Sequence, residues 1–250
     1  MKHPASSLPH SCLTAAALTL FAITPLHAEL PPVASAETTL FSDDFTDNAS
    51  QWTNIAGVND PGKSIVRHAA LADSLWGPSI VSDGKDVASS VYLKQTADLA
   101  NGPISVYFRV RAENPKGSDG SRFDITLRES TGNHLVTLSL RPAMPGGIAY
   151  RDAAGKGTRT NTASTSKLFR TPGVFVSFKL AITHGQDKFP ATAEAFYYDE
   201  SQAAYVSLGK AGDLVNLSTG KFNRIDIVSR NGEKGATWFD SVVIAQTLAK

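Results

Sequence analysis

The chain contains very little cysteine: Cys12 is the only one among 250 residues. Methionine is almost as scarce, with only Met1 and Met144, which excludes a soft Met-rich binding groove. Neither sign of charge is in excess, because 24 Lys+Arg stand against 23 Asp+Glu. A strongly basic nucleic-acid-binding protein is therefore excluded. At 42% hydrophobic and 19% charged, the chain is suited to bury a sizeable core.

The N-terminus has the features of an export signal. Lys2 supplies a positive charge near the start, and residues 13–23 form an apolar run. Residues 26–28 (Leu-His-Ala) end in a small residue, as expected before a cleavage site. About 20 apolar residues are needed to span a membrane, and this run is shorter, so we expect no membrane span. We predict a signal peptide over residues 1–28 and a secreted, periplasmic or extracellular protein. Cys12 leaves with it, which excludes disulfides, cysteine nucleophiles and thiolate metal sites from the mature chain.

The rest of the chain is predicted to form a short spacer and one domain. Residues 29–39 are rich in Pro, Ala and Thr and include a second possible cleavage site at residues 34–36 (Ala-Ser-Ala). Residues 40–250 show no linker and no repeat, so we predict a single domain there. Gly155, Gly157 and Arg159 lie in a segment that we interpret as a flexible basic loop.

The sequence of the domain predicts short strands separated by turns. Its segments are rich in Val, Ile, Phe, Tyr and Thr and are punctuated by Gly, Asn and Asp. The predicted strands are Ser89–Lys94, Ile104–Ala112, Arg122–Glu129, His134–Arg141, Val174–Thr183, Ala191–Tyr198, Ala204–Leu208, Phe222–Arg230 and Thr237–Ala245. Only Ala69–Leu75 and Ala211–Leu217 favour short helices. Many strands and few helices predict an all-β fold, an antiparallel sandwich of two sheets.

One hairpin can be predicted in detail. The segments Arg122–Glu129 and His134–Arg141 alternate between apolar and polar residues, which places their apolar side chains on one face. A two-residue turn at residues 131–132 sets Phe123 opposite Leu140. A turn one residue later slips the pairing by two and leaves the faces unchanged.

The opposite face of these strands is rich in arginine, and the strand Ile104–Ala112 alternates in the same way. If the strands are neighbours, they form one basic surface that bears a tyrosine. Guanidinium groups bind carboxylates through paired hydrogen bonds and Tyr107 could stack on a sugar ring, so this face is a candidate site for an acidic glycan. The alternative is a solvent face on which carboxylates such as Asp124 balance the arginines. The candidate ligand-binding residues are Tyr107, Arg109, Arg111, Arg122, Arg128, Arg141 and Lys179.

Both ends of the domain carry motifs of a known superfamily. The run Leu-Phe-Ser-Asp-Asp-Phe at residues 40–45, followed by Trp52, resembles the opening strand of concanavalin A-like and laminin-G-like jelly rolls. Residues 238–244 (Trp-Phe-Asp-Ser-Val-Val-Ile) resemble their closing strand. The resemblance implies a jelly-roll sandwich of the bacterial secreted, carbohydrate-associated type. In that group the first and last strands are often adjacent.

The same resemblance implies a structural Ca²⁺. In the superfamily, acidic residues of the two end strands can hold the ion, and by position these are Asp43 or Asp44 together with Asp240. Ca²⁺ takes six to eight oxygen ligands and needs neither His nor Cys. No organic cofactor is expected.

Three functions fit these observations. The first is a non-catalytic module that binds a glycan or polysaccharide. The second is a polysaccharide lyase that acts on a uronate polymer, in which Arg109, Arg111 or Arg128 neutralises the carboxylate and Tyr198 or His134 removes the C5 proton. The third is a structural cell-envelope domain without a ligand. The oligomeric state is left open.

Overall fold

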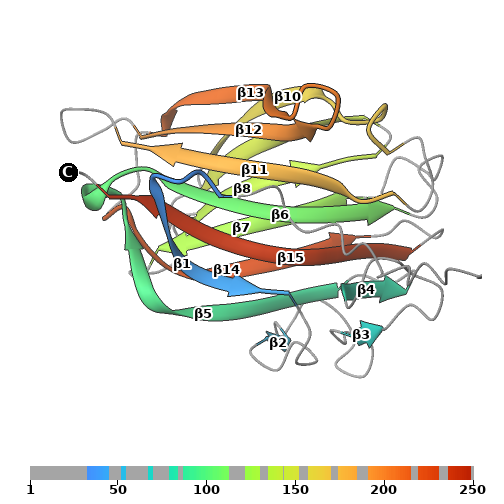
Figure 1. Cartoon of the computed structure of the whole chain (residues 1–250), viewed down its shortest axis with the longest axis horizontal. Coiled ribbons are helices and arrows are strands. Elements are labelled where there is room, and N and C mark those ends of the chain that lie inside the picture. Colours follow the sequence, from blue (N-terminus) through green and yellow to red (C-terminus); the bar gives the residue numbers. More distant parts are fainter. Residues whose placement is uncertain are drawn as a thin grey trace, which may run out of the picture.

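The structure is a computed structural model, and the account below concerns the residues that it describes. These are residues 33–44, 52–54, 67–69, 79–83, 87–112, 122–129, 135–142, 144–151, 157–169, 174–184, 191–214, 219–230 and 236–248. They form two antiparallel sheets packed face to face (Figure 1). The predicted all-β, two-sheet sandwich is confirmed. No helix among these residues is long and apolar enough to cross a membrane.

The first sheet, called here the β15 sheet, has eight strands, seven of which follow the order β13-β12-β11-β6-β15-β4-β3. Strand β1 also pairs with β15, so the first and last strands are adjacent, as the resemblance implied. The strands are β1 (Glu37–Asp43), β3 (Arg67–Ala69), β4 (Ser79–Asp83), β6 (Ile104–Ala112), β11 (Val176–Thr183), β12 (Ala191–Asp199), β13 (Ala204–Leu214) and β15 (Ala236–Thr247).

The second sheet, called here the β7 sheet, has seven strands in the order β10-β9-β8-β7-β14-β5-β2. A short 3₁₀ helix (Leu99–Asn101) leads from this sheet into the other. The strands are β2 (Thr53–Asn54), β5 (Val87–Asp98), β7 (Arg122–Glu129), β8 (Leu135–Leu140), β9 (Pro145–Arg151), β10 (Gly157–Ser164) and β14 (Lys221–Arg230).

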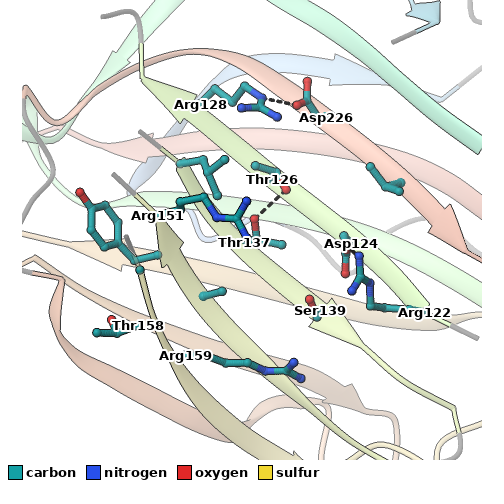
Figure 2. A pocket seen from close by; sticks show the side chains of 15 residues that line it. Arg122, Asp124, Thr126, Arg128, Thr137, Ser139, Arg151, Thr158, Arg159 and Asp226 are labelled. Atoms are coloured by element: carbon teal, nitrogen blue, oxygen red, sulfur yellow. Dashed lines mark hydrogen bonds and ion pairs between the residues drawn. The ribbon is translucent and has the colours of Figure 1, made fainter. Parts of the chain in front are cut away.

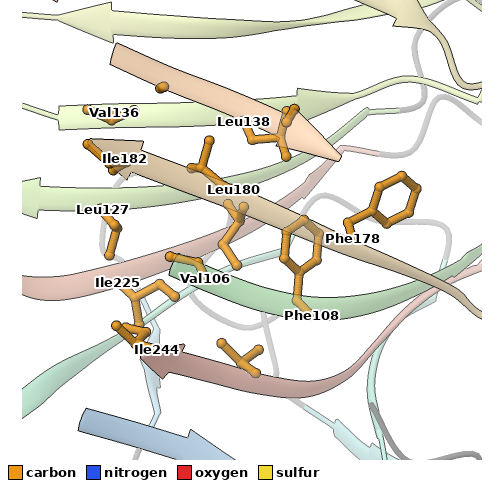
Figure 3. Close-up of a cluster of buried hydrophobic side chains, with 14 of the residues drawn as sticks. Val106, Phe108, Leu127, Val136, Leu138, Phe178, Leu180, Ile182, Ile225 and Ile244 are labelled. Carbon is orange, nitrogen blue, oxygen red and sulfur yellow. The ribbon is translucent and has the colours of Figure 1, made fainter. Parts of the chain in front are cut away.

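The core lies between the sheets and is built from alternate residues of each strand. Phe123 of the β7 sheet meets Phe239 of the β15 sheet edge to face, with ring centroids 5.9 Å apart. Phe169, from the turn after β10, lies between Phe123 and Phe178 at 5.8 Å from each. Aliphatic side chains such as Leu138 fill the space beside these rings (Figure 3). Because side chains alternate along a strand, this burial also determines which residues of each central strand point outward.

The predicted hairpin register is confirmed, because β7 and β8 pair Phe123 with Leu140 and Leu127 with Val136. The turn residues themselves lie outside the described residues.

Two other predictions are wrong. Residues 211–214 continue strand β13 instead of forming a helix, and Gly157 and Arg159 belong to strand β10 instead of a loop. The other predicted helix, Ala69–Leu75, lies outside the described residues apart from Ala69, which ends β3.

The alternation of β8 can be tested with two neighbouring residues. Leu138 is fully buried, and replacing it with Ala should lower the free energy of unfolding by about 2–5 kcal/mol because a cavity remains. Thr137 faces outward and shares a hydrogen bond of 2.8 Å with Thr126, so Thr137→Ala should cost only about 0.5–1.5 kcal/mol. Urea denaturation measures both changes. Equal losses would contradict the assigned faces.

Candidate functional site

The expected single basic face does not form, because β6 and β7 lie in different sheets. Alternation along each strand identified the outward residues, but it carries no information on which strands are neighbours. The candidate residues therefore divide between two outer faces. Tyr107, Arg109, Arg111 and Lys179 belong to the β15 sheet, whereas Arg122, Arg128 and Arg141 belong to the β7 sheet or its immediate end.

On the β15 sheet, the predicted tyrosine and lysine are held by a buried carboxylate. Glu37 reaches from β1 across β15 to β6, where it accepts hydrogen bonds from Tyr107 Oη (2.5 Å) and Ser105 Oγ (2.7 Å). The Lys179 ammonium lies 3.6 Å from Glu37 Oε1 and 4.9 Å from the centre of the Tyr107 ring. Tyr107 is only 1% exposed, so its ring is not available to stack on a sugar.

A buried ion pair occupies the neighbouring part of this face. Arg109 Nη1 lies 2.9 Å from Asp240 Oδ2, and both side chains are almost completely buried. The guanidinium also lies 5.0 Å from the centre of the Phe175 ring. Burial raises the pKa of the Asp240 carboxyl, and Arg109 opposes this by favouring the ionised form. Arg109 is thus engaged inside the structure and is not free to bind a ligand.

The predicted calcium ligands have other partners in this structure. Asp43 accepts a hydrogen bond of 2.7 Å from Trp52 Nε1, and Asp240 pairs with Arg109. Within the described part of the chain, no group of three or more His, Cys, Asp or Glu side chains is placed to hold a metal ion. A guanidinium already stands where a cation would meet Asp240, so the donor set fits Ca²⁺ poorly. Calcium binding by Asp43, Asp44 and Asp240 stays a prediction.

Of the predicted lyase residues, Tyr198 and Arg128 lie on different sheets, and Arg109 is held by Asp240. Tyr198 lies on β12 of the β15 sheet, where its ring is 5.2 Å from that of Tyr205. Arg128 lies on β7 of the other sheet. His134 lies outside the described residues. A single site cannot therefore use both Tyr198 and Arg128.

The outer face of the β7 sheet holds a groove of about 500 Å³ (Figure 2). Its floor follows from the strand registers. Thr126 lies opposite Thr137, which lies opposite Ala149, and Ser139 is two residues further along β8. These side chains are short, so the middle of the sheet stays open while longer side chains rise around it.

Four arginines surround this floor, as Figure 2 shows. They are Arg122 and Arg128 from β7, Arg151 from β9 and Arg159 from β10. Arg141 follows β8 at the same sheet but does not line the groove, and its Nη1 lies 2.9 Å from Met144 Sδ. The two aspartates that also line the groove, Asp124 and Asp226, leave its lining with a net charge of +2. The groove is therefore a basic hollow in a chain of nearly balanced charge.

Two of the four arginines are paired with those aspartates. Arg122 Nη2 lies 2.7 Å from Asp124 Oδ2, and Arg128 Nε donates to Asp226. Asp226 is 2% exposed and also accepts a 2.7 Å hydrogen bond from Arg224 Nε. These pairs hold the guanidinium groups in place, and Arg122 and Arg128 stay partly exposed at the groove.

Four residues of this face were not singled out from the sequence: Tyr92, Arg151, Arg224 and Asp226. Tyr92 is 63% exposed, and Arg224 lies 5.6 Å from the centre of its ring. Arg151 lies on β9, which begins Pro-Gly-Gly and was not predicted as a strand. The alternation of Ile148, Ala149, Tyr150 and Arg151 was the available signal, since it places the arginine outward.

Comparison with known proteins supports the fold and does not give a family. No family model matches the chain, and no curated protein matches it significantly. Among solved structures, the T. cruzi calreticulin globular domain is similar with a TM-score of 0.54 and 16% identity, covering 84% of this chain and 89% of that one. The Emp47p carbohydrate recognition domain is similar with a TM-score of 0.51 and 11% identity, covering 87% of this chain and all of that one.

Botulinum neurotoxin receptor-binding domains also match, but this chain spans only about two fifths of their length, at TM-scores of 0.42–0.47. We draw no conclusion from these matches. Identities this low show a shared fold alone. The fold and the groove together define a two-sheet β-sandwich with a basic hollow on one sheet face.

The hydrogen bonds of the β15 face predict unequal effects for two tyrosines. Tyr107→Phe deprives the buried Glu37 carboxylate of a donor, so we expect the free energy of unfolding to fall by about 1.5–3 kcal/mol. Tyr205→Phe is the matched control, because the Tyr205 hydroxyl is buried without a hydrogen-bond partner and its removal should cost almost nothing. Denaturant midpoints measure both. A loss at Tyr205 as large as that at Tyr107 would refute the assignment.

The same tyrosines predict a loss of stability at alkaline pH. Burial raises the pKa of both Tyr107 and Tyr205 well above the value of about 10 expected in the unfolded chain. Below that pH both states keep the phenol protons. Above it, the unfolded state releases them first, so the free energy of unfolding falls as the pH rises. In thermal melts, the double variant Tyr107→Phe/Tyr205→Phe should show a shallower fall above about pH 10; an unchanged slope would argue against this origin.

Proposed function

We propose that this protein is an exported glycan-binding module and that the groove on the β7 sheet is its binding surface. The groove itself carries the proposal, because it is open, floored by short side chains and walled by hydrogen-bonding groups. Thr126, Thr137 and Ser139 offer hydroxyls that both donate and accept, as sugar hydroxyls require. The likeness in fold to a domain named for carbohydrate recognition supports the proposal. The leader at residues 1–28 supports export.

The charge of the groove favours acidic sugars. Its lining carries a net +2, and the planar guanidinium group matches a carboxylate with two parallel hydrogen bonds. Tyr92 takes the role that the sequence gave to Tyr107. Its exposed ring lies on the same face, and Arg224, which contacts that ring, also bonds Asp226 of the groove lining. A sugar ring that leaves the groove on this side would stack on Tyr92.

Binding is better supported than catalysis. A lyase needs a base beside the groups that neutralise the substrate carboxylate. The carboxylates among the described lining residues, Asp124 and Asp226, are each held in an ion pair with arginine. Tyr198 lies on the other sheet. With both aspartates held by arginine and Tyr198 on the other sheet, the arrangement supports recognition of a glycan better than its cleavage.

Binding to a matched pair of polymers tests the proposal. Polygalacturonate and its fully methyl-esterified form share a backbone and differ in charge, so calorimetry should show tighter, salt-sensitive binding of the acidic form. Ala149→Trp places a large side chain on the groove floor and should abolish binding of both polymers. Ser207→Trp, at an exposed position of the β15 sheet, is the matched control and should bind normally.

The panel should include other acidic and neutral polysaccharides, each with and without Ca²⁺. If the protein binds none of them under either condition, the proposed function is wrong. If Ser207→Trp abolishes binding and Ala149→Trp does not, the binding surface lies on the other sheet.

A further inference from the structure

The arginines around the groove differ in whether their charge is already neutralised. Arg122 and Arg128 bond carboxylates whose side chains are 9% and 2% exposed, so their charges are met within the protein. Arg151 and Arg159 are exposed, and neither has an ion pair with a carboxylate among the described residues. The net charge of the lining thus resides at one end of the groove, on strands β9 and β10.

The register places these two arginines close together. Arg159 of β10 lies opposite Ala149 of β9, and Arg151 is two residues further along β9. They are therefore diagonal neighbours on one face, at about 7–8 Å between Cα atoms. The Arg159 guanidinium lies against Gly147, two residues from Ala149 on the side away from Arg151, so the two groups are spread along the same edge of the groove. Gly157 lies opposite Arg151 and has no side chain to stand between them.

Gly147 gives the Arg159 side chain its position. A Cβ atom at residue 147 would lie 2.6 Å from Arg159 Nε, closer than such atoms approach, and would make tight contacts with the Thr160 carbonyl oxygen at 3.0 Å and Arg159 Nη2 at 3.2 Å. The guanidinium thus lies against the backbone of β9, in space that exists because residue 147 is glycine. Gly147 is a positioning residue for Arg159. The side chain is held over the sheet, beside the floor of the groove, instead of extending freely into solvent.

We infer that the groove binds a glycan in two parts: Arg151 and Arg159 bind anionic substituents, carboxylates or sulfate esters, whereas Arg122 and Arg128 of β7, whose charges are met by Asp124 and Asp226, bind sugar hydroxyls. This inference rests on the proposed function. The guanidinium groups of Arg151 and Arg159 have no ion pair with a carboxylate among the described residues. They can therefore donate paired hydrogen bonds to an oxyanion and attract its negative charge. In the Arg122–Asp124 and Arg128–Asp226 pairs the positive charge is already met, while the partly exposed guanidinium groups can still donate to a neutral hydroxyl.

Variants that remove charge from Arg151 and Arg159 test the two parts of the groove separately. In Arg151→Gln/Arg159→Gln, the affinity for polygalacturonate should fall about tenfold or more, and the salt dependence should weaken with it. The affinity for the methyl-esterified polymer should stay unchanged, because its hydroxyl contacts remain. Lys210→Gln, which removes one exposed charge from β13 of the other sheet, is the matched control and should leave both affinities unchanged. Dextran sulfate beside dextran repeats the comparison with sulfate as the anion.

Gly147→Ala tests the positioning role. It should weaken binding of the acidic polymer in the natural protein and have no further effect in the Arg159→Gln background, since the displaced group is then already absent. A merely structural role of Gly147 predicts the same loss in both backgrounds. Circular dichroism melts check that each variant folds.

The outcomes distinguish this inference from the proposed function. If no polymer binds the natural protein, the proposed function fails. If the polymers bind but the double variant still prefers the acidic form to the same degree, the inference is wrong and the function stands. If dextran sulfate binds as tightly to the double variant as to the natural protein, sulfate is not recognised at Arg151 and Arg159.

Discussion

The outer faces of this protein depend on the packing of its two sheets through alternate side chains. Phe123 packs edge to face on Phe239 of the opposite sheet, and Phe169 fills the space between Phe123 and Phe178. Because successive residues of a strand point to opposite faces, burying Phe123 turns Arg122 and Asp124 outward. A slip of one residue would exchange the two sets and bury an ion pair in the core. The core therefore determines which polar groups can meet in the groove.

The polar groups of the two outer faces differ in their burial and in their pairing. On the β15 sheet, Glu37 is enclosed by donors from Ser105 and Tyr107, and Arg109 is enclosed with Asp240. A buried charge is tolerated only when it is paired and hydrogen-bonded, and these groups are fully used in satisfying one another. On the β7 sheet, the floor of short side chains leaves neighbouring polar groups in contact with solvent. That difference, and not the number of arginines, is why we propose the second face as the binding surface.

Parts of this arrangement could be predicted from the sequence, and others could not. Strict alternation in Arg122–Glu129 gave the faces of β7 and its register with β8, because period-two patterns are local. Which sheet a strand joins is decided by contacts between distant segments. Consecutive strands β6 and β7 thus lie in different sheets, and the predicted single face divided in two. Strand β10 was not predicted for another reason. It is exposed along most of its length and has almost no apolar face, so its sequence lacks the alternation that indicates a strand.

The placement of charge follows from the cost of holding like charges together. Arg128 and Arg224 lie directly opposite each other on β7 and β14, a pairing that would destabilise the sheet by itself. Asp226, bonded to both, removes that repulsion where the side chains are partly buried. At the edge of the sheet, water solvates the guanidinium groups of Arg151 and Arg159, so no internal counter-ion is required there. Free positive charge therefore collects at the exposed β9–β10 edge, where a ligand can reach it and where charge also hinders pairing with another strand.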